Sequence, residues 1–285
     1  MSAAERLREL LSGPDILATP GCYDALSARL VERAGFPVAF MGGFAVSASR
    51  IGMPDTGLIS YAEMVDQGRN ICAAVSIPVI GDGDTGYGNA VNVQRTVRGY
   101  AQAGFACVML EDQASPKRCG HTRGKQTVSR EEAFARIQAA VDERNAGADI
   151  LIMARTDALA TEGLEEAIHR ATTFASLGAD ITFLEGPRNE DQMRAFCKAV
   201  PGPKMANLVE QGDTPLLSPQ KLQAIGYKIA LHPLTLMLAG IQSMENALVS
   251  LKRGESAAGI ADFPHLREIV GFPEYNEAEK RYAGD

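Results

Sequence analysis

Residues 78–112 have the sequence PVIGDGDTGYGNAVNVQRTVRGYAQAGFACVMLED, and this stretch predicts the fold of the whole chain. The short apolar runs at its two ends, 78–84 and 106–112, have the length and composition of buried strands, and both end in acidic residues. Between them, Val93 and Val97 stand at the spacing of one face of a helix. The stretch therefore predicts one strand–helix–strand unit.

The same alternation recurs along the chain. We expect eight strands, at 15–21, 37–43, 78–84, 106–112, 149–156, 180–186, 203–209 and 227–233. Ser60 with Glu63, and Ser129 with Glu132, have the form of capping boxes at helix starts. Ser218 before Pro219 has the form of an N-cap followed by N1. Glycines such as Gly104 and Gly226 suit the left-handed position after a helix.

Continuous apolar strands joined by helices indicate a parallel sheet that is buried on both faces. Eight such units favour closure into a (β/α)₈ TIM barrel, with an open doubly wound sheet as the alternative. We expect a single domain over residues 1–285, which is an ordinary length for one such barrel. The barrel would cover about 15–253, with a helix before it and a helical extension over 254–285 after it.

Composition excludes several classes of protein. The net charge of −7 and the lack of a basic stripe argue against a nucleic-acid partner. No apolar run is long enough to span a bilayer, and the charged amphipathic N-terminus is unlike a signal peptide. The five cysteines are scattered without a Cys-x-x-Cys pair, which is typical of reduced thiols in the cytoplasm.

Acidic residues gather where the predicted strands end. Asp82, Asp84 and Glu111 end two strands, and Asp55 lies in the loop after another. In a barrel of this kind the C-terminal ends of the strands carry the active site, so these carboxylates would converge and repel one another. Mg²⁺, or Mn²⁺ in its place, would relieve this repulsion, with Asp82 as the direct ligand and the other three acids holding its waters. The alternative is that some of these acids cap helices or pair with Arg155.

A long loop at 113–128 carries a second group of chemical residues. Lys117, Arg118, His121 and Arg123 surround Cys119 in this loop. Such a basic environment lowers the pKa of a thiol and attracts a small anionic substrate. The alternative is a solvated basic loop in which the thiol has no role.

These residues together resemble a known family. The runs that carry the resemblance are Tyr-Asp-Ala-Leu-Ser-Ala at 23–28, Asp-x-Asp-x-Gly-Tyr-Gly-Asn at 82–89, Glu-Asp-Gln-x-x-Pro-Lys-Arg-Cys-Gly-His at 111–121, Ala-Arg-Thr-Asp at 154–157 and Asn-x-x-Glu at 207–210. In this order and spacing they are similar to the isocitrate lyase/phosphoenolpyruvate mutase superfamily, from about Leu17 to Pro233. The resemblance implies a Mg²⁺-dependent barrel that stabilises an enolate of a small oxo acid. It also implies a homotetramer, a dimer of dimers in which a C-terminal helix is exchanged.

The resemblance also assigns roles to residues. Arg155 would hold the substrate carboxylate and the developing oxyanion, and Cys119 would protonate the carbanion that leaves when a C–C bond breaks. We count His121 and Tyr23 as further catalytic candidates, with Tyr23 as the replacement base or an oxyanion donor. The substrate-binding residues implied are Gly42, Gly43, Phe44, Lys117, Arg118, Gly120, Glu185, Asn207 and Glu210.

Departures from the family pattern narrow the substrate. The Cys-Gly-His loop is typical of the C–C lyase branch, although carboxyphosphonoenolpyruvate mutase keeps a similar loop. Phe40 stands where methylisocitrate lyases have the Tyr assigned as the base. Leu238 stands where they have an Arg, so a third substrate carboxylate would lack a partner. The apolar residues expected to line the pocket instead are Phe44, Leu208, Leu234 and Leu238.

We therefore expect a Mg²⁺-dependent lyase that cleaves an alkylmalate such as 2,3-dimethylmalate to a 2-oxo acid and a carboxylate. The alternatives within the superfamily are a methylisocitrate lyase, an oxaloacetate hydrolase or decarboxylase, and a phosphonate mutase. A catalytically silent barrel that binds a metabolite is the alternative outside it.

Overall fold

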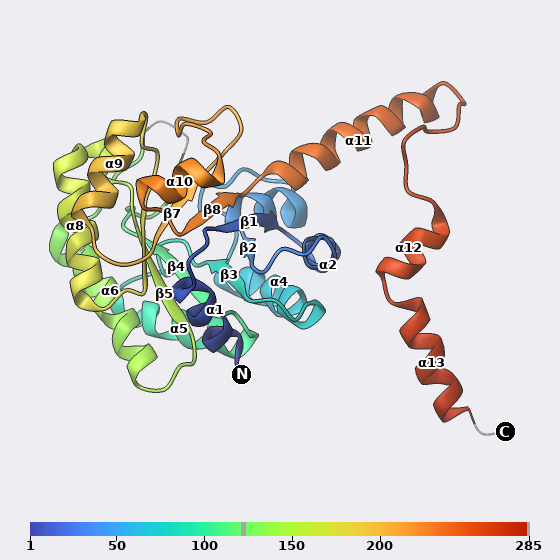
Figure 1. The fold of residues 1–285 in the computed structure, drawn as a ribbon, viewed down its shortest axis with the longest axis horizontal. Coiled ribbons are helices and arrows are strands. Elements are labelled where there is room, and N and C mark those ends of the chain that lie inside the picture. Colours follow the sequence, from blue (N-terminus) through green and yellow to red (C-terminus); the bar gives the residue numbers. More distant parts are fainter. Residues whose placement is uncertain (121–123, 284–285) are drawn as a thin grey trace. The chain divides into compact units, whose positions relative to one another are not determined.

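The computed structural model describes residues 1–120 and 124–283, and within them eight parallel strands form a closed barrel in sequence order (Figure 1). The strands are β1 (Leu17–Cys22), β2 (Ala39–Met41), β3 (Val79–Asp82), β4 (Cys107–Glu111), β5 (Leu151–Thr156), β6 (Ile181–Leu184), β7 (Lys204–Asn207) and β8 (Ile229–His232). β1 pairs with both β2 and β8, which closes the ring. The predicted (β/α)₈ barrel and its eight strands are confirmed, and the open sheet is excluded.

Helices alternate with the strands. They are α1 (Ala3–Ser12), α2 (Ala25–Arg33), α3 (Gly43–Val46), the π-helix η1 (Ser47–Ile51), α4 (Tyr61–Ala74), α5 (Ala90–Ala103), α6 (Arg130–Asn145), α7 (Ala158–Thr161), α8 (Leu164–Leu177), α9 (Glu190–Ala199), α10 (Pro219–Ile225), α11 (Thr235–Lys252), α12 (Phe263–Ile269) and α13 (Phe272–Tyr282). The predicted caps are largely confirmed. Ser60 and Glu63 cap each other reciprocally, and Ser218 caps α10 with Pro219 at N1. Ser129 accepts from the backbone of Glu132, but the Glu132 side chain pairs with Arg136 instead of closing a box.

The strands place alternate side chains on the two faces of the barrel wall, as the two-residue period of a strand requires. Phe183 and Met205 belong to the apolar cluster inside the barrel. Leu184 and Ala206, one residue further along each strand, pack in the outer cluster with residues of α9 and α10. Each position along a strand therefore has a defined side.

The N-terminal helix α1 contributes to the barrel interior. Leu7 is fully buried and Ala4 nearly so, and both belong to the same cluster as the inward side chains of the strands. Ser2 and Glu5 cap each other at its start. The amphipathic pattern of this segment accounts for the packing, because its apolar face is the one buried among barrel residues.

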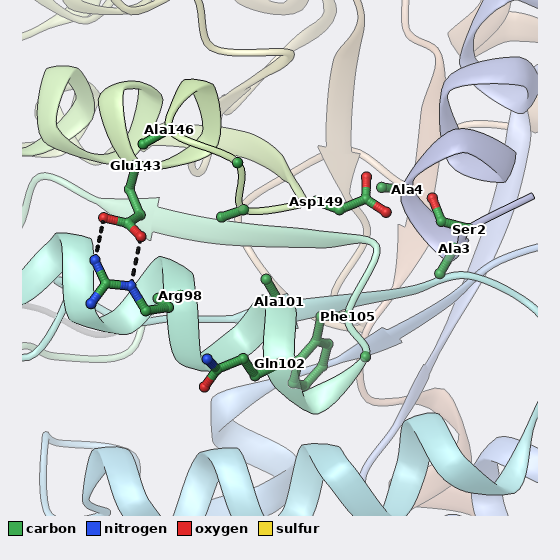
Figure 2. Close-up of a pocket in the computed structure, with 13 residues that line it drawn as sticks. Ser2, Ala3, Ala4, Arg98, Ala101, Gln102, Phe105, Glu143, Ala146 and Asp149 are labelled. Carbon is green, nitrogen blue, oxygen red and sulfur yellow. Dashed lines mark hydrogen bonds and ion pairs between the residues drawn. The ribbon is translucent and has the colours of Figure 1, made fainter.

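A hollow of about 580 Å³ lies where the start of α1 meets the ends of α5 and α6 (Figure 2). Arg98 and Glu143, which both line it, are joined by two hydrogen bonds of 2.8 and 3.0 Å. Phe105 and Asp149, which also line it, precede β4 and β5. The hollow is therefore at the N-terminal ends of the strands, opposite the end that carries active sites in this fold.

The chain divides into two compact units, Met1–Thr235 and Leu236–Asp285. α11, which the sequence prediction included in the barrel up to residue 253, falls almost wholly in the second unit. Within this unit Arg267 lies over the ring of Phe272, 4.7 Å from its centroid. The assignment of both units to one domain, and the exchange of the C-terminal helix, stay predictions. No helix in the described part of the chain has the length and apolar character to cross a membrane.

Candidate active site

The first unit contains a cavity of about 270 Å³ at the C-terminal ends of the barrel strands. Most of the residues that the sequence predicted to bind substrate or metal, or to act in catalysis, line this cavity. These are Gly42, Gly43, Phe44, Asp55, Asp82, Lys117, Cys119, Gly120, Arg155, Glu185 and Asn207. They come from strand ends and from the loops after β2 and β4, so only barrel closure brings them together.

Asp82 is held by two backbone amides. One carboxylate oxygen accepts from the amide of Gly43 at 3.0 Å, and the other accepts from the amide of Asp84 at 3.0 Å. A side chain at position 43 would place its Cβ 2.9 Å from the Asp82 carboxylate, so this approach requires glycine. The Gly43 amide, which the sequence assigned to the substrate, therefore binds Asp82 in this structure.

Lys117 lies between two carboxylates. Its ammonium group is 2.6 Å from Asp55 Oδ1 and 2.6 Å from Asp84 Oδ1, and all three side chains are buried. Burial raises the pKa of the Asp84 carboxyl to about 6, and the Lys117 ammonium opposes this rise. Burial alone would lower the pKa of Lys117, but Asp84 and the other carboxylates outweigh it and raise that pKa well above its usual range. Lys117, which was expected to bind substrate, thus offsets part of the negative charge of Asp55 and Asp84.

Glu111 and Arg155 are direct neighbours in the register of β4 and β5. Glu111 Oε2 is 3.3 Å from Arg155 Nε. Its other oxygen, Oε1, is buried and has no hydrogen-bond partner among the described residues. Burial raises the pKa of Glu111 well above its usual range, although Arg155 acts in the opposite direction. Of the four acids, Glu111 alone pairs with Arg155 among the described residues, as the alternative expected. Asp55 and Asp84 pair with Lys117 instead, and Asp82 is held by backbone amides.

Three carboxylates surround the Arg155 guanidinium. Asp157 accepts from Nε at 2.8 Å and from Nη2 at 3.0 Å. Glu185 lies 3.2 Å from Nη1, and Asn207 donates to the same Glu185 carboxylate. Burial would lower the pKa of Arg155, but Asp157 and the other acids raise it well above its usual range. Arg155 is therefore a fixed cation at the cavity wall.

Residues of the 113–128 loop reach the cavity and are anchored at several points. Cys119 is half-buried and lines the cavity beside Gly120. Gln113 binds the backbone of Arg118, and Lys125 binds the carbonyl of Gly120. A Cβ at position 120 would lie 2.5 Å from Arg155 Nη2, so glycine is required at this close approach as well.

Apolar side chains form much of the cavity lining, and we call them the apolar wall. They are Phe40, Met109, Phe183, Val209, Leu231 and Pro233, together with the predicted Phe44 and Leu234. The prediction that Leu208 lines the pocket is wrong. Its side chain packs in the outer cluster with residues of α9 and α10. The two-residue period of an extended chain explains the difference, since Asn207 and Val209 then share the inner side. Leu238 belongs to the second unit.

Several predicted residues lie elsewhere. The predicted residues that do not line the cavity are Tyr23, Asp84, Glu111, Arg118 and Glu210. Asp84 and Glu111 nevertheless contact the lining residues Lys117 and Arg155. Burial raises the pKa of Tyr23, with Asp24 adding to the rise, so the phenol is protonated at neutral pH and its phenolate is not available as a base. Glu210 accepts a hydrogen bond from Thr235, and Arg118 is exposed. His121 lies outside the described residues, as does Arg123.

Three functional neighbours were not assigned from the sequence. Asp157 orients Arg155, Lys125 reaches both Asp157 and Gly120, and Gln113 holds Arg118. All three stand in the runs that carry the family resemblance or next to them. Their partners are set by the folded loop, so no spacing rule would have named them.

The donor set fits a hard cation such as Mg²⁺. No group of three or more His, Cys, Asp or Glu side chains surrounds one metal position in the described residues. Mg²⁺ does not need such a group, because it commonly takes one or two carboxylates and keeps several waters. Asp82 lines the cavity, and each of its carboxylate oxygens accepts one hydrogen bond from a backbone amide. Glu111 Oε1 is buried and has no hydrogen-bond donor among the described residues. These oxygens can accept further contacts from a hydrated cation.

Known proteins with the same architecture cover almost the whole chain. The family model described as phosphoenolpyruvate phosphomutase matches residues 7–252. The chain is 42% identical to 2,3-dimethylmalate lyase of Eubacterium barkeri over 287 residues, with 99% of each chain covered. The solved structure of oxaloacetate acetylhydrolase with 3,3-difluorooxalacetate has a TM-score of 0.95 at 36% identity, covering 100% of this chain and 98% of the other.

A further solved structure, phosphonopyruvate hydrolase in complex with oxalate and Mg²⁺, has a TM-score of 0.89 at 30% identity and covers all of both chains. These matches agree with the closed barrel and with the motifs at the strand ends. The chain belongs to the phosphoenolpyruvate phosphomutase family, within the isocitrate lyase/phosphoenolpyruvate mutase superfamily.

Proposed function

We propose that this protein is a Mg²⁺-dependent lyase that cleaves the C2–C3 bond of a 2-hydroxy dicarboxylate. The substrate class is an alkylmalate such as 2,3-dimethylmalate, and the products are pyruvate or a related 2-oxo acid and a simple carboxylate. The observation that carries the proposal is that Cys119 and Arg155 line one cavity together with Asp82 and an apolar wall. The similarity to a 2,3-dimethylmalate lyase over 99% of both chains supports it.

Mg²⁺, or Mn²⁺ in its place, would be held by Asp82, with Asp55, Asp84 and Glu111 binding its waters. When bound, the metal would supply a Lewis acid for negative charge that develops on substrate oxygens. The buried and unpartnered Glu111 Oε1 supports this assignment, as does the Mg²⁺ in the structure of the related phosphonopyruvate hydrolase.

The chain's own residues would carry the remaining steps. Arg155 would bind the carboxylate at C2, with its guanidinium oriented by Asp157 at Nε and Nη2 and by Glu185 at Nη1. The 2-hydroxyl passes its proton to water and becomes the carbonyl as the C2–C3 bond breaks, and the electron pair of that bond passes to C3. Cys119 would donate its proton to C3, which yields the free carboxylate. Because Tyr23 does not line the cavity, we do not assign it the hydroxyl proton.

The apolar wall supports an alkyl-substituted substrate. Among the described lining residues, the cationic side chains are Lys117 and Arg155, and both already bind carboxylates. A third substrate carboxylate would have to be buried against Val209, Leu234 or a phenylalanine, at a high desolvation cost. The cavity therefore favours a dicarboxylate with alkyl groups over a tricarboxylate.

Oxaloacetate hydrolysis is the second candidate. The TM-score of 0.95 to an oxaloacetate acetylhydrolase favours it, and oxaloacetate is also a small dicarboxylate. In that reaction water attacks the carbonyl, and the products are oxalate and acetate. The same metal site and the same Arg155 would serve both reactions, so products decide between them.

The test incubates the enzyme with dimethylmalate, methylisocitrate and oxaloacetate separately, with and without Mg²⁺, and follows products by proton NMR. We expect Mg²⁺-dependent pyruvate and propionate from dimethylmalate. Pyruvate and succinate from methylisocitrate would overturn the argument from the apolar wall. If oxaloacetate is the one substrate of the three that is turned over, and it gives oxalate and acetate, the enzyme is the hydrolase. If none of the three substrates is turned over, both candidates are refuted.

We also propose a homotetramer in which α11 and the residues after it pack on neighbouring copies. α11 exposes Ile241, Met244, Leu248 and Leu251, which is an unusual apolar content for a solvated helix. Sedimentation equilibrium tests this: four chains per particle support the proposal, and a monomer at micromolar concentration contradicts it. A cytoplasmic location also stays a prediction, consistent with the five free cysteines.

A further inference from the structure

The Gln113 side chain forms two hydrogen bonds with the backbone of Arg118, the residue before Cys119. Its side-chain amide donates to the carbonyl of Arg118 at 2.8 Å and accepts from the amide of Arg118 at 2.9 Å. Gln113 is 1% exposed. Its own backbone is also fixed, because its carbonyl accepts from Arg136 at 3.0 Å and it pairs with Thr127 in an antiparallel bridge. This side chain therefore joins a rigid strand end to the residue before Cys119.

The Lys125 side chain forms a hydrogen bond with the backbone of Gly120, the residue after Cys119. Its ammonium group donates to the carbonyl of Gly120 at 2.5 Å and to Asp157 Oδ1 at 3.0 Å. The Lys125 side chain is 6% exposed, and Asp157 is fully buried. A buried ammonium requires such partners, since an unpaired charge would be very costly there. Lys125 therefore ties the residue after Cys119 to the acid that orients Arg155.

We infer that Gln113 and Lys125 are positioning residues that set Cys119 relative to Arg155. The inference rests on the proposed role of Cys119 as the proton donor. Gln113 holds Arg118, and Lys125 holds Gly120. Lys117 is held by Asp55 and Asp84. Cys119 is the residue between these anchors, so its thiol has little freedom to leave the cavity.

The geometry explains why two anchors are needed. A general acid must lie within hydrogen-bond reach of the atom it protonates, and a displacement of about 1 Å can cost on the order of 100-fold in rate. Gly120 packs so closely on Arg155 that a Cβ would lie 2.5 Å from Nη2. The Lys125 bond holds Gly120 at this contact, and thereby fixes the proton donor beside the group that binds substrate.

Two substitutions test the inference. Lys125→Met removes the hydrogen bonds to Gly120 and Asp157 while keeping the length of the side chain. Gln113→Met likewise removes the two hydrogen bonds to the backbone of Arg118. Lys125→Arg keeps a cationic donor and serves as the rescue. Lys221→Met is the matched control, because Lys221 forms an exposed ion pair with Glu190 on the outer helices.

The first readout is the rate at which N-ethylmaleimide alkylates Cys119, quantified by peptide mass spectrometry with and without Mg²⁺ and oxalate. We expect the rate to rise at least tenfold in Lys125→Met and Gln113→Met and to stay unchanged in Lys221→Met. The second readout is the split between kcat and KM. We expect kcat to fall by about 10- to 100-fold, with KM changed by less than about threefold and kcat partly restored in Lys125→Arg.

Unchanged alkylation of Cys119 in both methionine variants would overturn the inference, as would an unchanged kcat. If Gln113→Met fails to fold in a thermal melt, Lys125→Met carries the test alone. The alkylation readout does not depend on the substrate. An enzyme that stayed active as Cys119→Ser would refute the proposed role of Cys119, whereas faster alkylation would still support the anchoring.

Discussion

Asp157 binds Arg155 through both of its carboxylate oxygens, at 2.8 Å from Nε and 3.0 Å from Nη2. Asp157 is itself held by its backbone amide, which donates to Asp112 at 2.9 Å. Although burial would raise the pKa of Asp157, Arg155 and Lys125 lower it to about 2, so the carboxylate is ionised at any working pH. The plane of the guanidinium is thus set by a permanent charge.

Asp157→Asn should lower kcat by about 10- to 100-fold, because an amide offers one acceptor where the carboxylate offers two. Arg155 would keep its charge but lose its fixed orientation. Steady-state kinetics on the substrate identified by NMR measure the loss. Asp191→Asn, an exposed acid in the first turn of α9, is the control. Equal activity in the two variants would remove Asp157 from the site.

Cys119→Ser should abolish turnover and largely spare metal binding. A serine hydroxyl is a far weaker acid than a thiol, so it cannot supply the proton at neutral pH. Titration calorimetry with Mg²⁺ and oxalate should give a Kd close to that of the parent protein. Near-full activity of the variant would exclude Cys119 as the proton donor.

Removal of Mg²⁺ with EDTA should stop turnover, and added Mg²⁺ or Mn²⁺ should restore it. Asp82→Asn should weaken Mg²⁺-dependent oxalate binding by at least about 100-fold, since it removes the direct ligand's charge. Asp66→Asn, which removes an exposed partner of Arg50, should bind oxalate normally. Turnover that persisted in excess EDTA would contradict the metal assignment.

Leu7→Ala should destabilise the protein by about 2–5 kcal/mol, because Leu7 is fully buried among the side chains inside the barrel. Urea unfolding measures the change. Leu26→Ala, at an exposed position of α2, should stay within about 0.5 kcal/mol. Activity at low temperature should be unchanged in both variants, since α1 packs away from the C-terminal ends of the strands. A loss under 1 kcal/mol for Leu7→Ala would contradict the packing of α1.

Glu166→Gln should cost about 1 kcal/mol at pH 7, because Glu166 accepts from Arg130 and Arg170 while solvent screens the half-exposed Arg130. The Arg130 hydrogen bond lowers the pKa of Glu166 to about 2, so the carboxylate stabilises the fold fully above about pH 5. That contribution is lost as the pH falls from about 5 towards 2. Urea unfolding of both proteins at pH 7 and pH 4 should therefore show the difference narrowing. A constant difference would mean that Glu166 acts by packing alone.

Much of the fold and of the site could be predicted because local pattern and fold class act together. The eight apolar runs and the helix caps are local features, and a (β/α)₈ barrel places its chemistry at known strand ends. Asp82, Glu111 and Arg155 follow from this reasoning without any knowledge of their partners. Leu208 was assigned to the wrong side because a shift of one residue along a strand exchanges the two faces.

The sequence by itself determined that the chain is an alternating α/β protein with acids at strand ends and a basic loop carrying a thiol. It also determined the superfamily, because the motifs lie in one order along the chain. Only the tertiary structure decided that Lys117 neutralises Asp55 and Asp84, and that Lys125 connects Gly120 to Asp157. Long side chains choose their partners by distance in space, and these distances exist only once the barrel has closed and the loop has folded over it.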